Sequence, residues 1–102
     1  MQKNIYQLSK LAQIHLNKIK TYTVTNFSEA QWQTYKDVLI TGFQMLADNP
    51  AIGMDCSDLY PKGYYFPVGK HTAYFTKEKG FIMVVAVLGR SQLPQKHLIK
   101  IR

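Results

Sequence analysis

The sequence contains little cysteine and little acid. Its single cysteine, Cys56, rules out an internal disulfide, which favours a reducing compartment. Cys56 lies in a polar turn between Asp55 and Asp58, whose charges would raise the thiol pKa, so we expect an inert thiol. Thirteen lysines and arginines oppose six acids, giving a formal net charge of +7. This balance favours a polyanionic neighbour: nucleic acid, a nucleic-acid enzyme or an acidic regulator. A basic surface that only aids solubility is the alternative.

Long apolar runs are also missing. The longest, Phe81 to Leu88, suits a buried strand and is far too short to cross a bilayer. The first residues contain no apolar stretch of signal-peptide length, so we expect a cytoplasmic protein. A length of 102 residues predicts one domain, 1–102, with a core of moderate size.

Apolar periodicity predicts two helices after a weak strand signal at Asn4 to Leu8. Ser9 can cap the first helix, whose inward stripe is Leu8, Ala12, Leu16, Ile19 and Thr23. Ser28 and Gln31 form a capping box for the second helix, which Asp48-Asn49-Pro50 ends. Its inward stripe is Trp32, Tyr35, Leu39, Gly42/Phe43 and Leu46. The short link from Val24 to Phe27 predicts an antiparallel helical hairpin.

Three strand-like runs follow an irregular connection, Ala51 to Lys62, and lie at Gly63 to Val68, His71 to Lys77 and Phe81 to Leu88. The last run is apolar at nearly every position, as in a central strand covered on both faces. The hairpin would cover one face, and the cover of the other is an open question. The predicted fold class is α+β: an N-terminal strand, an antiparallel helical hairpin packed on a small antiparallel β-sheet, and a basic C-terminal tail. Leu98 to Arg102 could add an edge strand.

Charge is divided unevenly along the chain. Met1 to Asp58 has five basic and five acidic side chains, whereas Leu59 to Arg102 has eight basic residues and one acid, Glu78. The meander and tail should therefore meet an acidic partner.

Three segments carry a family resemblance: Tyr6-x-Leu8-Ser9-x-x-Ala12, Leu46-Ala47-Asp48-Asn49-Pro50-x-x-Gly53 and Val87-Leu88-Gly89-Arg90. Their order and spacing resemble the ParE branch of the RelE/ParE superfamily of bacterial toxin–antitoxin modules. The stretch from Val68 to Leu98 is similar to a subgroup found in three-component modules. The resemblance implies a toxin held inactive by an antitoxin whose disordered segment folds onto it. ParE relatives poison DNA gyrase, and RelE relatives cut mRNA in the ribosome.

The resemblance leaves two mechanisms to weigh. A RelE-type nuclease would use Lys70, His71, Arg90 and His97 as cations and proton carriers. Against this, the middle strand offers Thr72 to Phe75 where such an enzyme wants more cations, and Pro94 disturbs the spacing of Arg90 and His97. We therefore expect a non-enzymatic gyrase inhibitor without cofactor or metal, whose target contacts are Arg90, Lys96, His97, Lys70 and His71. The alternatives are a ribosome-dependent mRNA endonuclease and a basic nucleic-acid-binding module.

An apolar surface for the antitoxin is expected on the first helix, where Leu11, Ile14 and Tyr22 fall off the inward stripe. The sheet face opposite the hairpin is a second apolar surface. The antitoxin would place a helix on the first surface and an extended stretch along a sheet edge, with acids meeting Lys70, Arg90 and Lys96. Such patches predict a free toxin that is poorly soluble or self-associated. His71 and His15 are interpreted as a surface residue and a helix-face residue. Tyr64, Tyr65 and Phe66 could stack on bases, although strand alternation predicts that at least one is buried.

Overall fold

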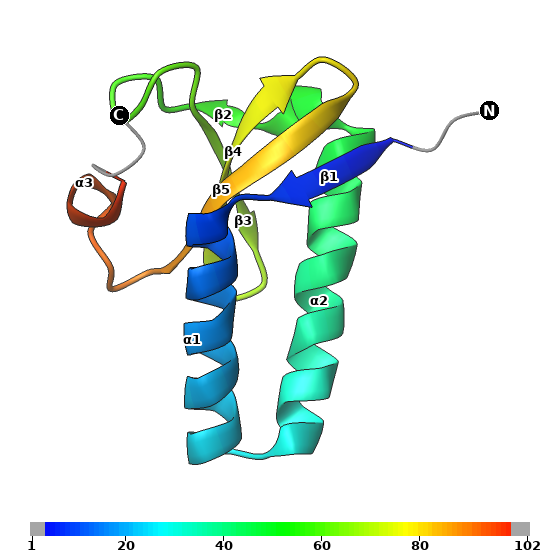
Figure 1. Cartoon of the computed structure of the whole chain (residues 1–102), viewed down its shortest axis with the longest axis vertical. Helices are drawn as coiled ribbons and strands as arrows, with labels where there is room; N and C mark the ends of the chain where they lie inside the picture. Colours follow the sequence, from blue (N-terminus) through cyan, green and yellow to red (C-terminus); the bar gives the residue numbers. More distant parts are fainter. Residues whose placement is uncertain (1–3, 99–102) are drawn as a thin grey trace.

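The computed structural model describes residues 4–98 and contains a five-stranded sheet with a helical hairpin on one face (Figure 1). The strand order is β1-β5-β4-β3-β2. The predicted α+β fold is confirmed. In chain order the elements are β1 (Ile5–Leu8), α1 (Lys10–Asn26), α2 (Glu29–Asp48), the 3-10 turn η1 (Pro50–Ile52), β2 (Met54–Asp55), β3 (Tyr64–Val68), β4 (His71–Glu78), β5 (Phe81–Gly89) and α3 (Pro94–His97).

The sheet is mixed. Strands β3 to β5 form an antiparallel meander, as predicted. The short β2 extends it by pairing antiparallel with β3, and β1 joins it parallel to β5. Because β1 ends at Leu8, opposite Val84, no strand within residues 4–98 pairs with the second half of β5 on that side. The side chains of Ser9, the N-cap of α1, and of His15 in α1 bond to this edge instead. The Ser9 hydroxyl donates to the Val85 carbonyl at 3.0 Å, and His15 Nδ1 accepts from the Val87 amide at 3.1 Å.

Both helices begin where the sequence predicts. The hydroxyls of Ser9 and Ser28 accept hydrogen bonds from the amides of Ala12 and Gln31, which satisfies free N–H groups of each first turn. The predicted link from Val24 to Phe27 is wrong, because α1 continues to Asn26. Its β-branched residues lower helix propensity only slightly, and burial of Thr23 outweighs that preference.

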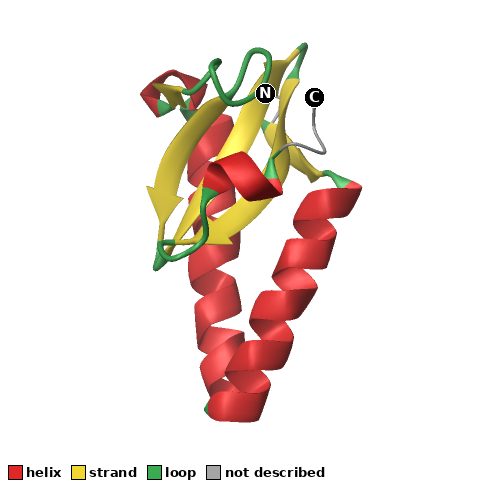
Figure 2. Ribbon diagram, turned by 90° about the vertical axis from the view of Figure 1, so that its left-hand side faces the viewer, coloured by secondary structure: helices red, strands yellow, loops and turns green. Residues whose placement is uncertain are grey.

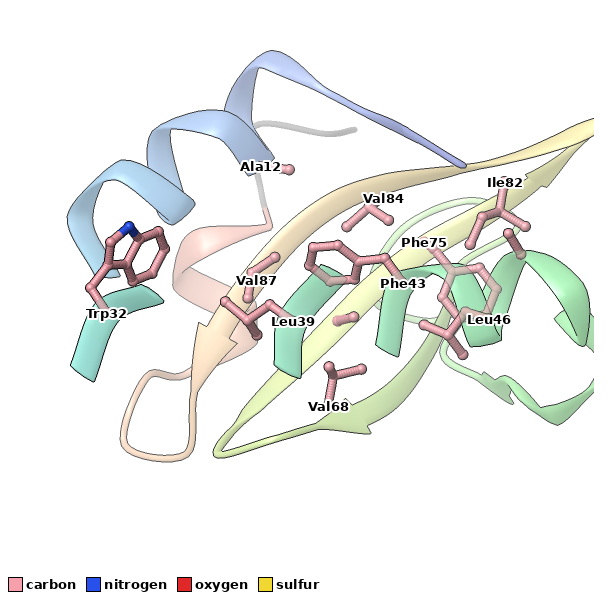
Figure 3. Close-up of a cluster of buried hydrophobic side chains, with 12 residues drawn as sticks. Ala12, Trp32, Leu39, Phe43, Leu46, Val68, Phe75, Ile82, Val84 and Val87 are labelled. Atoms are coloured by element: carbon pink, nitrogen blue, oxygen red, sulfur yellow. The ribbon is translucent and has the colours of Figure 1, made fainter. Parts of the chain in front are cut away.

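The hairpin face of the sheet holds the larger core cluster (Figure 3). The predicted stripe of α2 is confirmed: Trp32, Leu39, Phe43 and Leu46 are buried. They meet apolar residues of β3, β4 and β5, namely Val68, Ala73, Phe75, Ile82, Val84 and Val87. Burial of this cluster is what fixes the hairpin on the sheet.

The opposite face of the sheet is not the open apolar surface that we expected, because the chain covers it. Cys56 and Tyr60, from the connection after β2, pack with Leu98 against Tyr74, Val85, Ala86 and Leu88. The Tyr60 hydroxyl lies 2.9 Å from the carbonyl oxygens of both Tyr64 and Phe75. The sequence missed this cover because the connection from 51 to 62 has no apolar period.

Cys56 is buried rather than in an exposed polar turn. Burial raises the pKa of its thiol, and the charges of Asp58 and Asp55 add to the effect. The predicted direction is therefore confirmed, although desolvation is the main cause.

Three short elements, η1, β2 and α3, were not predicted. The possible edge strand at Leu98 to Arg102 falls almost entirely outside residues 4–98. Within that described range, no helix combines the length and the apolar character needed to cross a membrane.

Candidate functional site

One end of the sheet gathers cationic residues. The register of β4 and β5 pairs His71 with Gly89. Lys70 precedes His71 and Arg90 follows Gly89, so these residues converge although twenty positions separate Lys70 from Arg90 along the chain. Lys70 and Arg90 are both exposed. The sheet register therefore unites three of the predicted target-binding residues.

The helical hairpin reaches past the sheet, as Figure 2 shows. A groove of about 560 Å³ lies between α1, the start of α2 and the cationic end of β4 and β5. Its apolar lining comes from Ile19, Tyr22, Phe27 and Val87, and its polar lining from His15, Lys18, Thr23, Gln31, Tyr35, Lys70, His71, Ser91 and Gln92, with Gly89 at the edge. Among the described residues, those that line it include no acid. The groove therefore suits an apolar ligand that carries negative charge.

A hydrogen-bond network ties the groove to α2. The Tyr35 hydroxyl lies 2.5 Å from His71 Nδ1, and the Lys70 amide donates to the same hydroxyl at 2.9 Å. Gly69, at φ +60°, makes the turn between β3 and β4, and a Cβ there would lie 2.8 Å from the Tyr35 hydroxyl oxygen. A side chain at Gly69 would thus be both strained and crowded.

Burial shifts the pKa values of both side chains in this network. It lowers the pKa of His71, which favours the neutral imidazole. It raises the pKa of Tyr35, an effect that the hydrogen bond from the Lys70 amide partly offsets. At neutral pH Tyr35 therefore keeps its proton and can donate it.

The burial and contacts of two histidines differ from what the sequence analysis expected. His71 is not a simple surface residue, because it is half-buried and bonded to Tyr35. His15 is buried, 7% exposed, and holds the β5 edge through Val87. Its spacing of three from Ala12 and four from Ile19 placed it on the inward stripe, a signal that sequence reasoning did not use.

The tail residues lie apart from the groove lining. Lys96 is exposed on α3, and the half-buried ring of His97 packs edge-to-face against His15, with ring centroids 6.4 Å apart. Neither residue lines the groove. The predicted set of five target-binding residues is therefore divided between the sheet end and α3.

The outer side of α1 exposes two of the three predicted apolar residues, among polar neighbours such as Asn17, Thr21 and Thr25. Ile14 is 44% exposed and Tyr22 is 63% exposed, whereas Leu11 is half-buried. Phe27, which the sequence analysis did not select, is 64% exposed, and its ring contacts that of Tyr22. Tyr22 lines the groove and also a shallow depression on the outside of α1, so the two surfaces are continuous.

The aromatic run of β3 does not form a platform for bases. Tyr64 and Phe66 pack against the hairpin-side cluster, and Tyr65 packs against the opposite one. The predicted alternation is confirmed, although all three are half-buried rather than one fully buried. Residues 4–98 contain no group of three His, Cys, Asp or Glu side chains that could hold a metal ion.

Comparison with known proteins gives concordant matches. Residues 6–94 match the family described as "ParE toxin of type II toxin-antitoxin system, parDE". Toxin ParE1 of Mycobacterium tuberculosis, from strains CDC 1551/Oshkosh and H37Rv, is 33% identical over 84 residues, which is 81% of this chain and 86% of the relative. A solved structure, "Chromosomal ParDE TA system from P. aeruginosa", superposes with a TM-score of 0.72 at 11% identity, covering 85% of this chain and 96% of that one.

The family match includes the groove and stops short of the tail. Lys70, His71 and Arg90 lie inside residues 6–94, whereas Lys96 and His97 lie beyond them. The family match therefore gives no support for a role of the two tail residues.

Proposed function

The chain belongs to the ParE toxin family of type II toxin–antitoxin systems, and on this premise we propose that it arrests growth by binding DNA gyrase and trapping the enzyme with its DNA cut. The contact surface is the cationic end of the sheet, with Lys70, His71 and Arg90 at its centre. Lys96 and His97 on α3 extend it. The family implies an antitoxin partner, which has to block this surface.

The observation that carries the proposal is the convergence of exposed cations beside an open groove. Such an arrangement supplies what an inhibitor needs, which is an apolar surface edged with charge. Gyrase bound to DNA offers acidic surface for Lys70 and Arg90. The proposed mechanism needs no catalytic group.

The same residues are poorly arranged for cutting RNA. Cleavage needs one group to take the 2′-OH proton and another to protonate the leaving oxygen. The Nδ1 atom of His71 is already engaged by Tyr35, and the His97 ring lies against His15. On the middle strand Ala73, Tyr74 and Phe75 are buried, so they offer no cation to a phosphorane. A ribosome-dependent mRNA endonuclease that uses Arg90 and His97 is therefore the second candidate.

The antitoxin contacts follow from the same surface. An apolar segment of the antitoxin covers the outer face of α1 at Leu11, Ile14 and Tyr22 and continues into the groove, because Tyr22 belongs to both. Its acidic side chains meet Lys70, Arg90 and Lys96. A segment that is disordered alone can fold along such an extended surface.

The test compares the two targets directly. Purified protein is incubated with gyrase and supercoiled plasmid, and in parallel with translating ribosomes. The proposal predicts gyrase-dependent DNA cleavage and intact mRNA. Codon-specific mRNA cuts without an effect on gyrase would instead establish the second candidate. His97→Ala separates the mechanisms further, because it would abolish catalysis through His97, whereas the loss of one contact at the edge of the surface would only weaken binding.

A further inference from the structure

The Tyr35 hydroxyl carries one proton and forms hydrogen bonds with two neighbours. It accepts from the Lys70 amide at 2.9 Å and lies 2.5 Å from His71 Nδ1. An amide N–H can only donate, so the hydroxyl accepts from Lys70, and its own proton is available for His71 Nδ1. When the hydroxyl donates to Nδ1, the imidazole proton lies on Nε2.

The Nε2 side of His71 faces the rim of the groove. A Cβ built on Gly89 would lie 3.9 Å from His71 Cδ2 and 4.0 Å from Nε2. Both Gly89 and His71 line the groove, and Gln92 closes this rim by accepting from the Gly89 amide at 2.7 Å. With the proton on Nε2, His71 presents an N–H donor at the mouth of the groove.

We propose that the groove receives a carboxylate of the antitoxin, flanked by an apolar side chain, and that the Nε2–H of His71 and the ammonium of Lys70 bind it together. Tyr35 is the positioning residue, because it holds the His71 tautomer and the Lys70 backbone at once. The inference rests on the proposed binding of the antitoxin in this groove and names the chemistry that the groove selects.

The lining favours a carboxylate over other ligands. Its charged side chains are Lys18 and Lys70, and among the described lining residues there is no acid to repel an anion. The walls of Ile19, Tyr22, Phe27 and Val87 suit an apolar body. A neutral imidazole of this tautomer carries its one N–H at Nε2, so it needs no positive charge to donate. The site therefore keeps its donor at and above neutral pH.

A small probe tests the site without antitoxin or gyrase. Hydrocinnamate carries a phenyl ring and one carboxylate, and hydrocinnamyl alcohol is its uncharged counterpart. Both are titrated into the full chain and followed by the NMR shifts of the Lys70 and Gly89 amides. The expected result is that the carboxylate binds about ten-fold more tightly than the alcohol, because charge-assisted hydrogen bonds are the stronger kind. Equal binding of the two, or shifts confined to other surfaces, would overturn the inference.

Two substitutions of His71 by residues with amide side chains distinguish the roles of its two ring nitrogens. In His71→Gln the side-chain amide can stand near Nε2, and in His71→Asn it stands near Nδ1. We expect His71→Gln to keep hydrocinnamate affinity within about three-fold and His71→Asn to lose about ten-fold. The reverse order would contradict the assignment of the donor to Nε2. Amide spectra of both variants show whether the fold is retained.

The tautomer itself is measurable. The ¹⁵N shifts of the imidazole should show a protonated Nε2 and an unprotonated Nδ1 in the wild type. Tyr35→Phe keeps the ring and removes the hydroxyl, so we expect it to mix the tautomers and weaken hydrocinnamate binding. A wild-type His71 with its proton on Nδ1 would contradict the inference. The gyrase proposal would stand, since the gyrase assay does not depend on the tautomer.

Discussion

The two faces of the sheet are covered by different means. On one face the hairpin of α1 and α2 supplies long, regular helices whose buried residues recur every three or four positions. On the other face an irregular connection and the residue after α3 supply single anchors, Tyr60 and Leu98. The regular cover overhangs the sheet and leaves a groove, whereas the irregular cover places its anchors directly on the strands. The groove thus lies where the regular cover extends beyond the sheet that it packs on.

The sharpest test of this contrast uses two leucines of equal burial. Leu39 on α2 and Leu98 after α3 are each 1% exposed. We expect Leu39→Ala to lower the free energy of unfolding by about 3 kcal/mol, because the helix cannot collapse into the cavity. Leu98→Ala should cost about 2 kcal/mol, since a helix of 4 residues relaxes more easily than one of 20. Urea denaturation measures both, and equal or reversed costs would contradict the contrast between the two covers.

A smaller effect is expected at the polar anchor of the irregular cover. Tyr60→Phe removes the hydroxyl that bonds to the carbonyls of Tyr64 and Phe75. The free energy of unfolding should fall by about 1 to 2 kcal/mol, because a buried acceptor loses its donor. The control is Tyr65→Phe, a half-buried tyrosine packed on the same cluster, which should cost less. A neutral Tyr60→Phe variant would mean that packing alone holds this face.

The smallest expected effect is the pH dependence that His71 adds at the groove. Burial lowers the pKa of His71 below its ordinary 6.5 in the folded state. The unfolded chain then binds the proton more readily, so this contribution to stability is complete above pH 6.5 and is lost as the pH falls through the lower folded pKa. Denaturation of wild type and His71→Gln from pH 7.5 to pH 5 measures it. The variant should lose less stability on acidification, and parallel curves would contradict the shift.

The regular cover could be predicted from the sequence, and the irregular one could not. Ser9 and Ser28 cap helices through contacts three residues away, and Leu39 and Phe43 repeat with the helical period, so local pattern is enough for both. Tyr60 lies in a connection without apolar period, and Leu98 follows a helix of only four residues, so neither burial leaves a periodic signal in the sequence.

The groove lies between these cases. The residues at the adjoining end of the sheet, Lys70, His71 and Arg90, could be selected by charge and by resemblance. The pairing of Tyr35 with His71, however, joins residues 36 positions apart and depends on how the hairpin sits on the sheet. His15 followed the helical period and was still missed, because a buried histidine was not expected to replace a strand at the β5 edge.

The account depends on the cationic end of the sheet beside the groove, and two double variants of equal charge test it directly. Lys70→Ala with Arg90→Ala removes two cations there, and Lys77→Ala with Lys79→Ala removes two at the opposite end of β4. Gyrase-dependent cleavage of supercoiled plasmid is measured for both and for the wild type. The account predicts that the first double variant loses cleavage and the second keeps it. Equal activity of the two folded variants would contradict it.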